Sequence, residues 1–262
     1  MRVLRKGMVG DDVKVLQQFL GIAVDGAFGT QTENAVKKWQ AENGLVADGV
    51  VGMKTWTKIA DFKAVAAGVI YDPLKTHITK SPNRPIKYIA IHYTAGGSSK
   101  PGSALKVKNV FESRKASADF AVDDEKMVQF NPDLKNYYCW AVGDQKNMFS
   151  KGGSLYGKAI NKNTISIEIC SNLKYGTSTS VPNHEGWYFT GEALRNAAEL
   201  CKILMEKYDI PFENVVRHYD ISGKMCPGII GWNDENIYTT VGKQTKEKST
   251  SKEWEYFKKM LK

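Results

Sequence analysis

Alternation of strand-like and helical segments between residues 86 and 226 is the feature that most constrains the fold. The segment "IKYIAIHYTA" reads as a strand with Tyr88, Ala90 and His92 on one side, and "NTISIEIC" reads as a second, more apolar strand. A helical pattern follows in "TGEALRNAAELCKILMEKYDI", and "ENVVRHY" is a short strand that reaches His218. Strands interleaved with helices predict an α/β domain with a mixed central β-sheet flanked by helices.

An internal repeat occupies the first 60 or so residues. The segment "DGAFGTQT" begins at Asp25 and "DGVVGMKT" begins at Asp48, so the same turn residues recur 23 positions apart. Each Asp-Gly predicts a turn that tolerates positive φ, and a short helix follows each turn. Together with an earlier helix led by Asp11 and Asp12, the pattern predicts a small three-helix domain over residues 1–62.

The length and the net charge of the chain limit its number of domains and its possible partners. Its 262 residues, 42% of them hydrophobic, suffice for the cores of one or two domains. A net charge of +9 fits polyanionic partners, which include nucleic acid, acidic lipid and the anionic polymers of a bacterial wall. No run approaches about 18 apolar residues, so we expect no membrane insertion.

The beginning of the sequence also lacks the pattern of an export signal. The segment "MRVLRKGMVGDDVKVL" is basic but contains no apolar stretch and no small-residue cleavage site. We therefore expect synthesis in the cytoplasm without a signal peptide. A role outside the cell would then require release by lysis or by a non-standard export route.

Two histidines and a cysteine are candidate metal ligands. His92 lies near the end of the first strand, and "RHYDISGKMCPG" contains His218 and Cys226. Zinc favours imidazole nitrogen and thiolate sulfur, and a catalytic zinc keeps three protein ligands. Taken singly, His92 also fits a core histidine and Cys226 a turn residue. Cys170 and Cys201 lie in a strand-like and a helical pattern, so we expect them in the core.

Two parts of the sequence resemble known families. The segment from "GDDVKVLQQFLG" to "DGVVGMKTW" resembles the peptidoglycan-binding domains appended to bacterial and phage wall hydrolases. The segments "YIAIHYTAGG", "SADFAVDDEKMVQFNP", "NTISIEIC" and "VVRHYDISGKMCPG" resemble successive motifs of the zinc-dependent N-acetylmuramoyl-L-alanine amidases. That family includes phage endolysins and is related to peptidoglycan recognition proteins. The second resemblance covers residues 85–232.

The resemblance implies a site and a reaction. By position, His92, His218 and Cys226 match the zinc ligands, Glu168 matches the catalytic base, and Lys224 matches a lysine beside the site. Zinc would polarise the amide carbonyl and activate a water molecule, and the glutamate would accept the proton of that water. The lysine would face the oxyanion. The implied activity is hydrolysis of the amide between N-acetylmuramic acid and L-alanine of the stem peptide.

The sequence departs from the family pattern at two positions. Many relatives have a histidine where this chain has Asp119, and some have a catalytic tyrosine where it has Ala118. We interpret the missing tyrosine as leaving the acid–base work to Glu168.

The remaining segments complete the domain organisation. We predict a linker at residues 63–84, the zinc amidase domain at 85–232, and a basic, flexible spacer with a C-terminal helix at 233–262. That helix would have Trp254, Phe257 and Leu261 on one side, and it would either dock on the amidase domain or contact an anionic wall polymer.

Three other functions remain open at this level. The main alternative is a non-catalytic peptidoglycan recognition protein, although such relatives typically lack the cysteine ligand that Cys226 would provide. A zinc peptidase that cuts a different bond of the stem peptide is the second. A nucleic-acid binder is the third, but no fingerprint of one is present, so we expect no nucleic-acid partner. The expected partners are bacterial peptidoglycan and anionic wall polymers.

Overall fold

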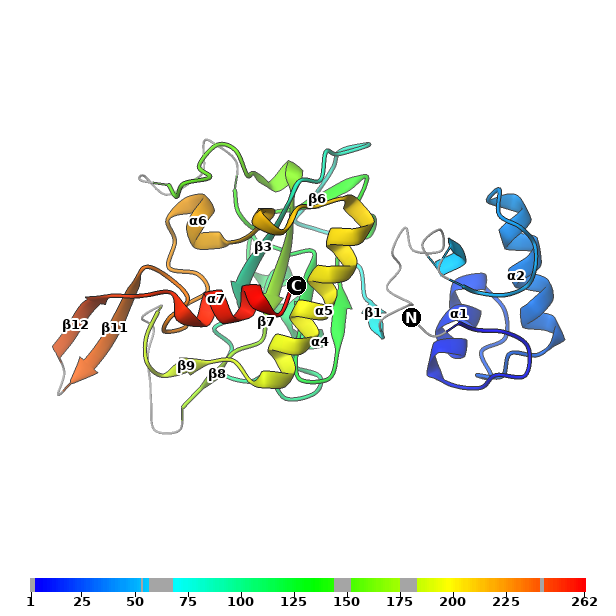
Figure 1. The fold of residues 1–262 in the computed structure, drawn as a ribbon, viewed down its shortest axis with the longest axis horizontal. Helices are drawn as coiled ribbons and strands as arrows, with labels where there is room; N and C mark the ends of the chain where they lie inside the picture. The colour runs from blue at the N-terminus through cyan, green and yellow to red at the C-terminus, as the bar shows by residue number, and fades with distance from the viewer. Residues whose placement is uncertain (1–2, 53, 57–67, 144–151, 175–182, 241–242) are drawn as a thin grey trace. The chain divides into compact units, whose positions relative to one another are not determined.

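The computed structural model describes the chain except for residues 1–2, 53, 57–67, 144–151, 175–182 and 241–242 (Figure 1). The chain divides into two compact units, Met1–Tyr71 and Asp72–Lys262. The first unit contains α1 (Asp11–Leu20), α2 (Thr30–Glu42) and β1 (Val69–Tyr71). Residues 54–56 are helical, and the rest of the predicted third helix lies outside the described residues.

A buried glutamine organises each copy of the repeat in the first unit. The Nε2 atom of Gln17 donates to the Asp25 carboxylate at 2.7 Å and to the Thr32 hydroxyl at 3.0 Å. Its Oε1 atom accepts the backbone N–H of Gly26 at 2.8 Å. Gly26 has a φ of +77°, which favours glycine. The glutamine therefore fixes the turn that the sequence pattern predicts.

The second copy repeats this arrangement 23 residues later. Gln40 donates to Asp48 at 2.9 Å and to Thr55 at 3.0 Å, and it accepts the N–H of Gly49 at 2.9 Å. Apolar side chains between the two turns form one core, which consists of Leu4, Val13, Leu16, Phe28, Val36, Val51 and Trp56. The sequence repeat is thus a repeat of buried hydrogen-bond networks.

The second unit is built around a mixed sheet with strand order β5-β4-β7-β3-β10. Its strands are β3 (Tyr88–Tyr93), β4 (Phe120–Val122), β5 (Met127–Gln129), β7 (Thr164–Ile169) and β10 (Val215–Arg217). Strands β10, β3, β7 and β4 run parallel to one another, whereas β5 is antiparallel to β4. The isoleucines of β3 and β7 are fully buried, as expected for parallel strands covered on both faces.

Helices flank this sheet, which confirms the predicted α/β fold class. They are α4 (Ser103–Ser113), α5 (Gly191–Tyr208), α6 (His218–Ser222) and α7 (Lys252–Lys259). In Figure 1, α5 and α7 cross in front of the sheet. The Thr190 hydroxyl accepts the N–H of Ala193 at 3.2 Å and so caps α5 where the sequence predicts its start.

Shorter elements connect the main ones. They are β2 (Ile78–Lys80), β6 (Tyr137–Cys139), β8 (Asn172–Leu173), β9 (Trp187–Tyr188), and the 3₁₀ turns Asn161–Asn163 and Phe212–Asn214. Strand β2 pairs with β6, and β8 pairs with β9.

The predicted linker differs from the structure in its second half. From residue 72 onward it belongs to the second unit, and it contributes β2 to a strand pair with β6. Its last part holds Arg84, which is only 1% exposed and donates to the carbonyl of Leu134. The segment mixes Ala, Gly, Pro and Ser without periodicity, which predicted a linker, but long-range hydrogen bonds fix its last part in the interior.

The predicted flexible spacer is also wrong in part. Strands β11 (Glu235–Thr240) and β12 (Lys243–Lys248) form an antiparallel pair. Ile237 anchors it, because its side chain is buried. A strand is hard to recognise in this lysine-rich sequence, because few apolar residues alternate with the polar ones.

The C-terminal helix docks on the second unit. Phe257 and Leu261 are buried, and the rings of Trp254 and Phe257 lie 5.4 Å and 5.3 Å from that of Trp232 between centroids. Of the two positions that the sequence left open for this helix, the structure has the docked one.

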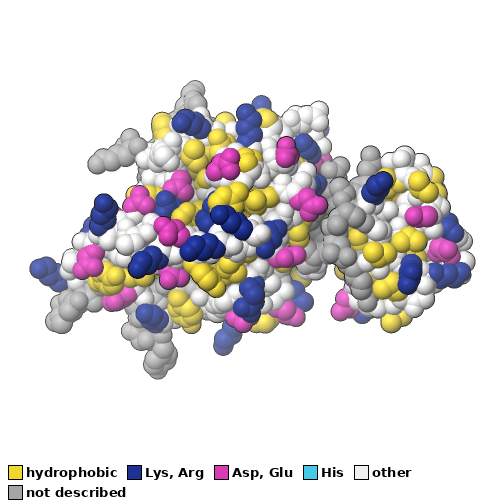
Figure 2. Space-filling view, in the orientation of Figure 1, with side chains coloured by type: hydrophobic (Ala, Val, Ile, Leu, Met, Phe, Trp, Pro, Cys, Tyr) yellow, Lys and Arg dark blue, Asp and Glu magenta, His cyan; other side chains and the backbone are white. Residues whose placement is uncertain are grey.

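The surface charges and the helices relate to the predictions about anionic partners and membranes. On the face of the second unit shown in Figure 2, Lys and Arg side chains are spread among Asp, Glu and hydrophobic side chains. No helix among the described residues is long and apolar enough to cross a membrane.

Replacing Gln17 by Ala should selectively destabilise the first unit. The change leaves the buried backbone N–H of Gly26 and the Asp25 carboxylate without their partner, at a cost of about 2 kcal/mol or more. Hydrogen exchange with mass spectrometry should show lost protection in peptides from α1 and α2. Gln18→Ala removes an exposed glutamine from the same helix and should change little. Equal protection in the two variants would contradict the assigned role of Gln17.

Candidate active site

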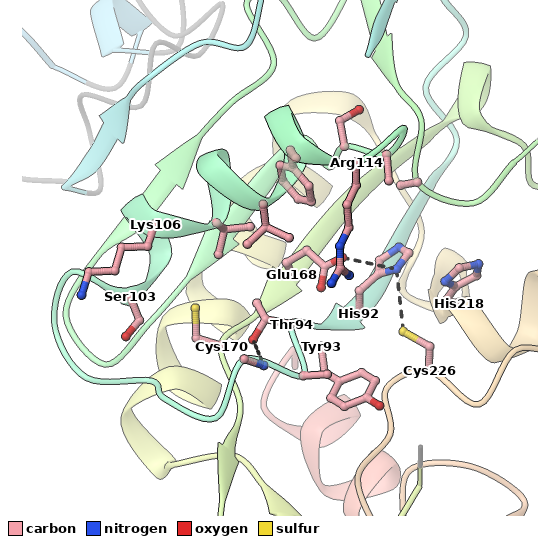
Figure 3. A pocket seen from close by; sticks show the side chains of 18 of the residues that line it. His92, Tyr93, Thr94, Ser103, Lys106, Arg114, Glu168, Cys170, His218 and Cys226 are labelled. Carbon is pink, nitrogen blue, oxygen red and sulfur yellow. Dashed lines mark hydrogen bonds and ion pairs between the residues drawn. The ribbon is translucent and has the colours of Figure 1, made fainter. Parts of the chain in front are cut away.

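Strand register brings three of the predicted site residues to one level of the sheet. Strands β3 and β7 are parallel, and His92 pairs directly with Glu168. Strand β10 is parallel to β3 with Arg217 opposite Ile91, so His218 follows at the level of His92. Figure 3 shows the side chains of His92, His218, Glu168 and Cys226 gathered at one end of a cavity.

A tight turn after β10 returns the chain to this point. Helix α6 begins at His218 and ends at Ser222, and its C-cap Gly223 has a φ of +75°. The N–H of Tyr219 then donates to the carbonyl of Cys226 at 2.9 Å. Gly228 packs so closely on Tyr93 that a Cβ at this position would lie 2.3 Å from the ring. The glycine therefore lets the segment after Cys226 lie against β3.

The two histidines and the cysteine form a cluster whose size fits a metal ion. Their ligand atoms all lie within 4.8 Å of one another, and Cys226 Sγ is 3.8 Å from His92 Nδ1. Ligand atoms around a tetrahedral zinc ion are about 3.3–3.8 Å apart, given the usual bond lengths. Among the described residues, His218 Nδ1 is buried without a hydrogen-bond partner. An unpartnered buried nitrogen of this kind fits a metal ligand.

Burial sets the protonation of these ligands. It lowers the pKa of His218 to about 3 and that of His92 well below its usual value, with Lys224 contributing in both cases. It raises the pKa of the Cys226 thiol to about 12, and Glu168 adds to this shift while Lys224 opposes it. Both imidazoles are therefore neutral at neutral pH, as metal ligands must be, whereas the thiol must lose its proton to bind a cation.

Glu168 stands beside the cluster as the candidate base. Its Oε1 atom is 4.0 Å from His92 Nδ1, and its side chain is 17% exposed. Among the described residues its Oε2 atom has no hydrogen-bond partner. Burial raises its pKa to about 8, against the opposing effect of Lys224. Lys224 itself is exposed and lines the same cavity.

The cavity next to the cluster has a volume of about 580 Å³. One of its walls includes Lys106 and Val110 of α4 and Arg114, the extended C-cap residue of that helix, and Trp140 lines it as well. The sequence analysis assigned none of these four residues. The four-residue spacing of Lys106 and Val110 was the available signal for the helical part of this wall.

Asp119, where many relatives have a histidine, is a structural residue. It is 1% exposed, and its carboxylate accepts hydrogen bonds from Asn131 Nδ2 at 2.6 Å and from the N–H of Ser166 at 2.8 Å. The Arg84 guanidinium lies 3.4 Å away. Neither Asp119 nor the buried Ala118 lines the cavity. The departure at this position thus leaves the predicted ligand set untouched.

Comparison with protein families finds one match within each of the two units. Residues 82–229 match the family described as N-acetylmuramoyl-L-alanine amidase. The chain belongs to this family. Residues 9–59 match a second family, described as a putative peptidoglycan binding domain.

Individual relatives carry related names. The chain is 53% identical over 143 residues to the N-acetylmuramoyl-L-alanine amidase CwlH of Bacillus subtilis, which is 53% of this chain and 46% of the relative. It is 31% identical over 183 residues to the amidase CwlL of Bacillus licheniformis, which is 63% of this chain and 44% of the relative. This chain thus spans less than half the length of either relative.

Among solved structures, the catalytic domain of XlyA is similar to this chain. The sequence identity is 25% and the TM-score is 0.48, and the match covers 74% of this chain and 99% of that one.

Replacing Asp119 by Ala should unfold the second unit more easily without removing a site residue. The change leaves the Arg84 guanidinium buried without its carboxylate, which costs about 3 kcal/mol or more. Thermal denaturation should report the loss. Glu125→Ala removes a carboxylate from an exposed ion pair and should cost less than about 1 kcal/mol. Unchanged stability with impaired metal binding would instead place Asp119 in the site.

Proposed function

We propose that this protein hydrolyses the amide between N-acetylmuramic acid and L-alanine of the peptidoglycan stem peptide. The observation that carries the proposal is the cluster of His92, His218 and Cys226 with Glu168 beside it, at one end of a cavity of about 580 Å³. Membership of the amidase family supports the reaction class.

Zinc is the metal that this donor set fits best. Two imidazoles and a thiolate are zinc ligands in open, three-residue sites, and harder cations such as Mg²⁺ prefer oxygen. We assign His92, His218 and Cys226 as the ligands. A zinc ion held there would act as a Lewis acid toward the amide carbonyl and would lower the pKa of water.

Glu168 is the proposed proton carrier. Its carboxylate accepts a proton from the attacking water and then donates it to the departing amine. Lys224 and a bound cation both lower the pKa of this group, and so favour the carboxylate form that accepts the proton.

Lys224 is the proposed electrostatic partner of the oxyanion. Its ammonium group is on the wall of the same cavity and already influences His92, His218 and Glu168. Stabilisation of a developing negative charge by one such group is worth about 3 kcal/mol.

The first unit is the proposed wall anchor. Residues 9–59 match a peptidoglycan-binding family, so we assign residues 1–62 to peptidoglycan binding and residues 85–232 to catalysis. The site of action is then the bacterial cell wall. The exposed lysines of β12, Lys243, Lys246 and Lys248, are suited to an anionic wall polymer.

Glu168→Gln should lower the rate of peptidoglycan digestion by at least about 100-fold, because the amide cannot carry the proton. The measurement is digestion of purified peptidoglycan, followed by mass spectrometry of the soluble fragments and detection of new N-terminal L-alanine. Glu125→Gln, on an exposed carboxylate, is the control.

The products separate the candidate functions. Free N-terminal L-alanine from the wild type, lost in Glu168→Gln, supports the amidase and its base. Wall binding with zinc present but no fragments would make the protein a recognition protein. Fragments that end at another bond would indicate a zinc peptidase.

Zinc binding at neutral pH should release more than one proton. The Cys226 thiol must become a thiolate, and a bound cation also lowers the pKa of Glu168, which burial raises to about 8, while both imidazoles are already neutral. The affinity should therefore rise by at least about tenfold per pH unit between pH 6 and 8. Isothermal titration calorimetry in buffers of different ionisation enthalpy measures the proton count. Cys226→Ser should weaken binding and reduce the proton count by about one.

A matched control exists in the same cavity. Cys170 also lines it and is buried, but it lies outside the cluster. Cys170→Ala should retain both the affinity and the proton count. Loss of binding in this variant instead would shift the thiolate ligand from Cys226 to Cys170.

A further inference from the structure

The turn that carries His218 and Cys226 is held from outside the region that matches the amidase family. The family match ends at residue 229. The chain beyond residue 232, here named the C-terminal segment (residues 233–262), contacts this turn through hydrogen bonds of two of its residues, Asn233 and Ser251. The support of the two late candidate ligands therefore includes residues that the family match leaves out.

Asn233 fixes the backbone directly after Cys226. The asparagine is fully buried, and its Nδ2 atom donates to the carbonyl of Pro227 at 2.5 Å. Pro227 follows Cys226 by one peptide bond. A hydrogen bond to the Pro227 carbonyl therefore limits the movement of the Cys226 backbone, and with it the position of the thiol.

Arg217 fixes the backbone at the other late ligand, His218. Its backbone N–H and its guanidinium both donate to the Asp220 carboxylate, at 2.8 Å and 2.5 Å. Asp220 lies in the first turn of α6, and His218 is the first residue of that helix. The charged pair thus closes the turn in which His218 lies.

The same guanidinium reaches the C-terminal segment. Its Nη1 atom donates to the carbonyl of Trp232 at 2.5 Å and lies 3.4 Å from the Ser251 hydroxyl oxygen. That hydroxyl donates to the carbonyl of Asn233 at 3.1 Å. One network of hydrogen bonds therefore joins Arg217 to Asn233 through Ser251, which directly precedes α7.

This network can affect a metal ion only through the ligands. Of the residues that the structure describes, those that line the cavity include neither Arg217 nor Asn233. Contacts that orient the ligands contribute to metal affinity, because they fix the ligand atoms before the ion arrives. The ligand atoms of the cluster already lie within 4.8 Å of one another without an ion, as such a fixed arrangement requires.

We propose that Asn233 and Arg217 are positioning residues of the metal centre. Asn233 holds Cys226, and Arg217 holds His218, at the spacing that one metal ion requires. Ser251 connects the two positioning residues, so the docked C-terminal segment is part of the metal centre. The inference rests on the proposed function, because it takes His218 and Cys226 as metal ligands.

Asn233→Ala in the full chain should weaken zinc binding by about 10–100-fold, because the backbone after Cys226 loses the hydrogen bond from Nδ2. Competition with a zinc chelator measures the affinity. The matched control is Asn131→Ala, which removes a buried asparagine whose Nδ2 atom donates to Asp119 at 2.6 Å. It should lower the melting temperature and keep the zinc affinity of the wild type.

Cobalt(II) in place of zinc gives a second measurement that does not depend on activity. A thiolate ligand produces a sulfur-to-cobalt charge-transfer absorption, and the visible bands of cobalt report its coordination geometry. Asn233→Ala and Arg217→Ala should each change this spectrum, whereas Asn131→Ala should not. Arg217→Lys should recover part of the loss, because lysine can still donate to Asp220.

The outcomes separate this inference from the proposed function. Wild-type zinc affinity with an unchanged cobalt spectrum in Asn233→Ala would overturn the inference and leave the amidase intact. Equal losses of affinity in Asn233→Ala and Asn131→Ala would also overturn it, because general destabilisation would explain both. A wild type that binds no zinc would overturn the proposed metal centre and this inference with it. A wild type that binds zinc but releases no N-terminal L-alanine would overturn the proposed reaction alone.

Discussion

The parallel register of β10, β3 and β7 is the constraint on which the site depends. Because His92 pairs with Glu168, and Arg217 pairs with Ile91, three residues that are far apart in the sequence reach the same edge of the sheet. A shift of one residue in either pairing would turn a ligand or the base to the opposite face. The buried isoleucines of β3 and β7 prevent such a shift, since it would expose the core.

Burial then gives the cluster its chemistry. The same low-dielectric surroundings keep the imidazoles of His92 and His218 neutral, hold the proton on Cys226 and raise the pKa of Glu168. A cation placed among these groups would relieve the cost of desolvating a thiolate and a carboxylate. The low-dielectric surroundings therefore affect both the affinity of the cluster for a metal and the pKa of the base.

The two units solve the problem of buried polar groups in related ways. In the first unit, Gln17 and Gln40 each satisfy an Asp-Gly turn from within the core. In the second, Asp119 joins Arg84 to the backbone of β7 at Ser166. Each of these polar side chains is held by several partners, so replacing one of them leaves more than one buried group unsatisfied.

The sequence by itself determined the local structure and the chemical types. Apolar alternation predicted β3 and β7, the Asp-Gly repeat predicted the turns of the first unit, and the family motifs predicted the donor set of His92, His218 and Cys226 with Glu168. These features depend on neighbouring residues or on residue type, which a sequence displays directly.

Only the tertiary structure decided what depends on distant neighbours. It showed that Asp119 pairs with Arg84, that β11 and β12 pair antiparallel, and that Arg114, which follows α4, lines the cavity. In each case a polar or charged residue has two possible environments, solvent or a specific partner. The neighbouring sequence does not distinguish these two environments, because the partner comes from another part of the chain.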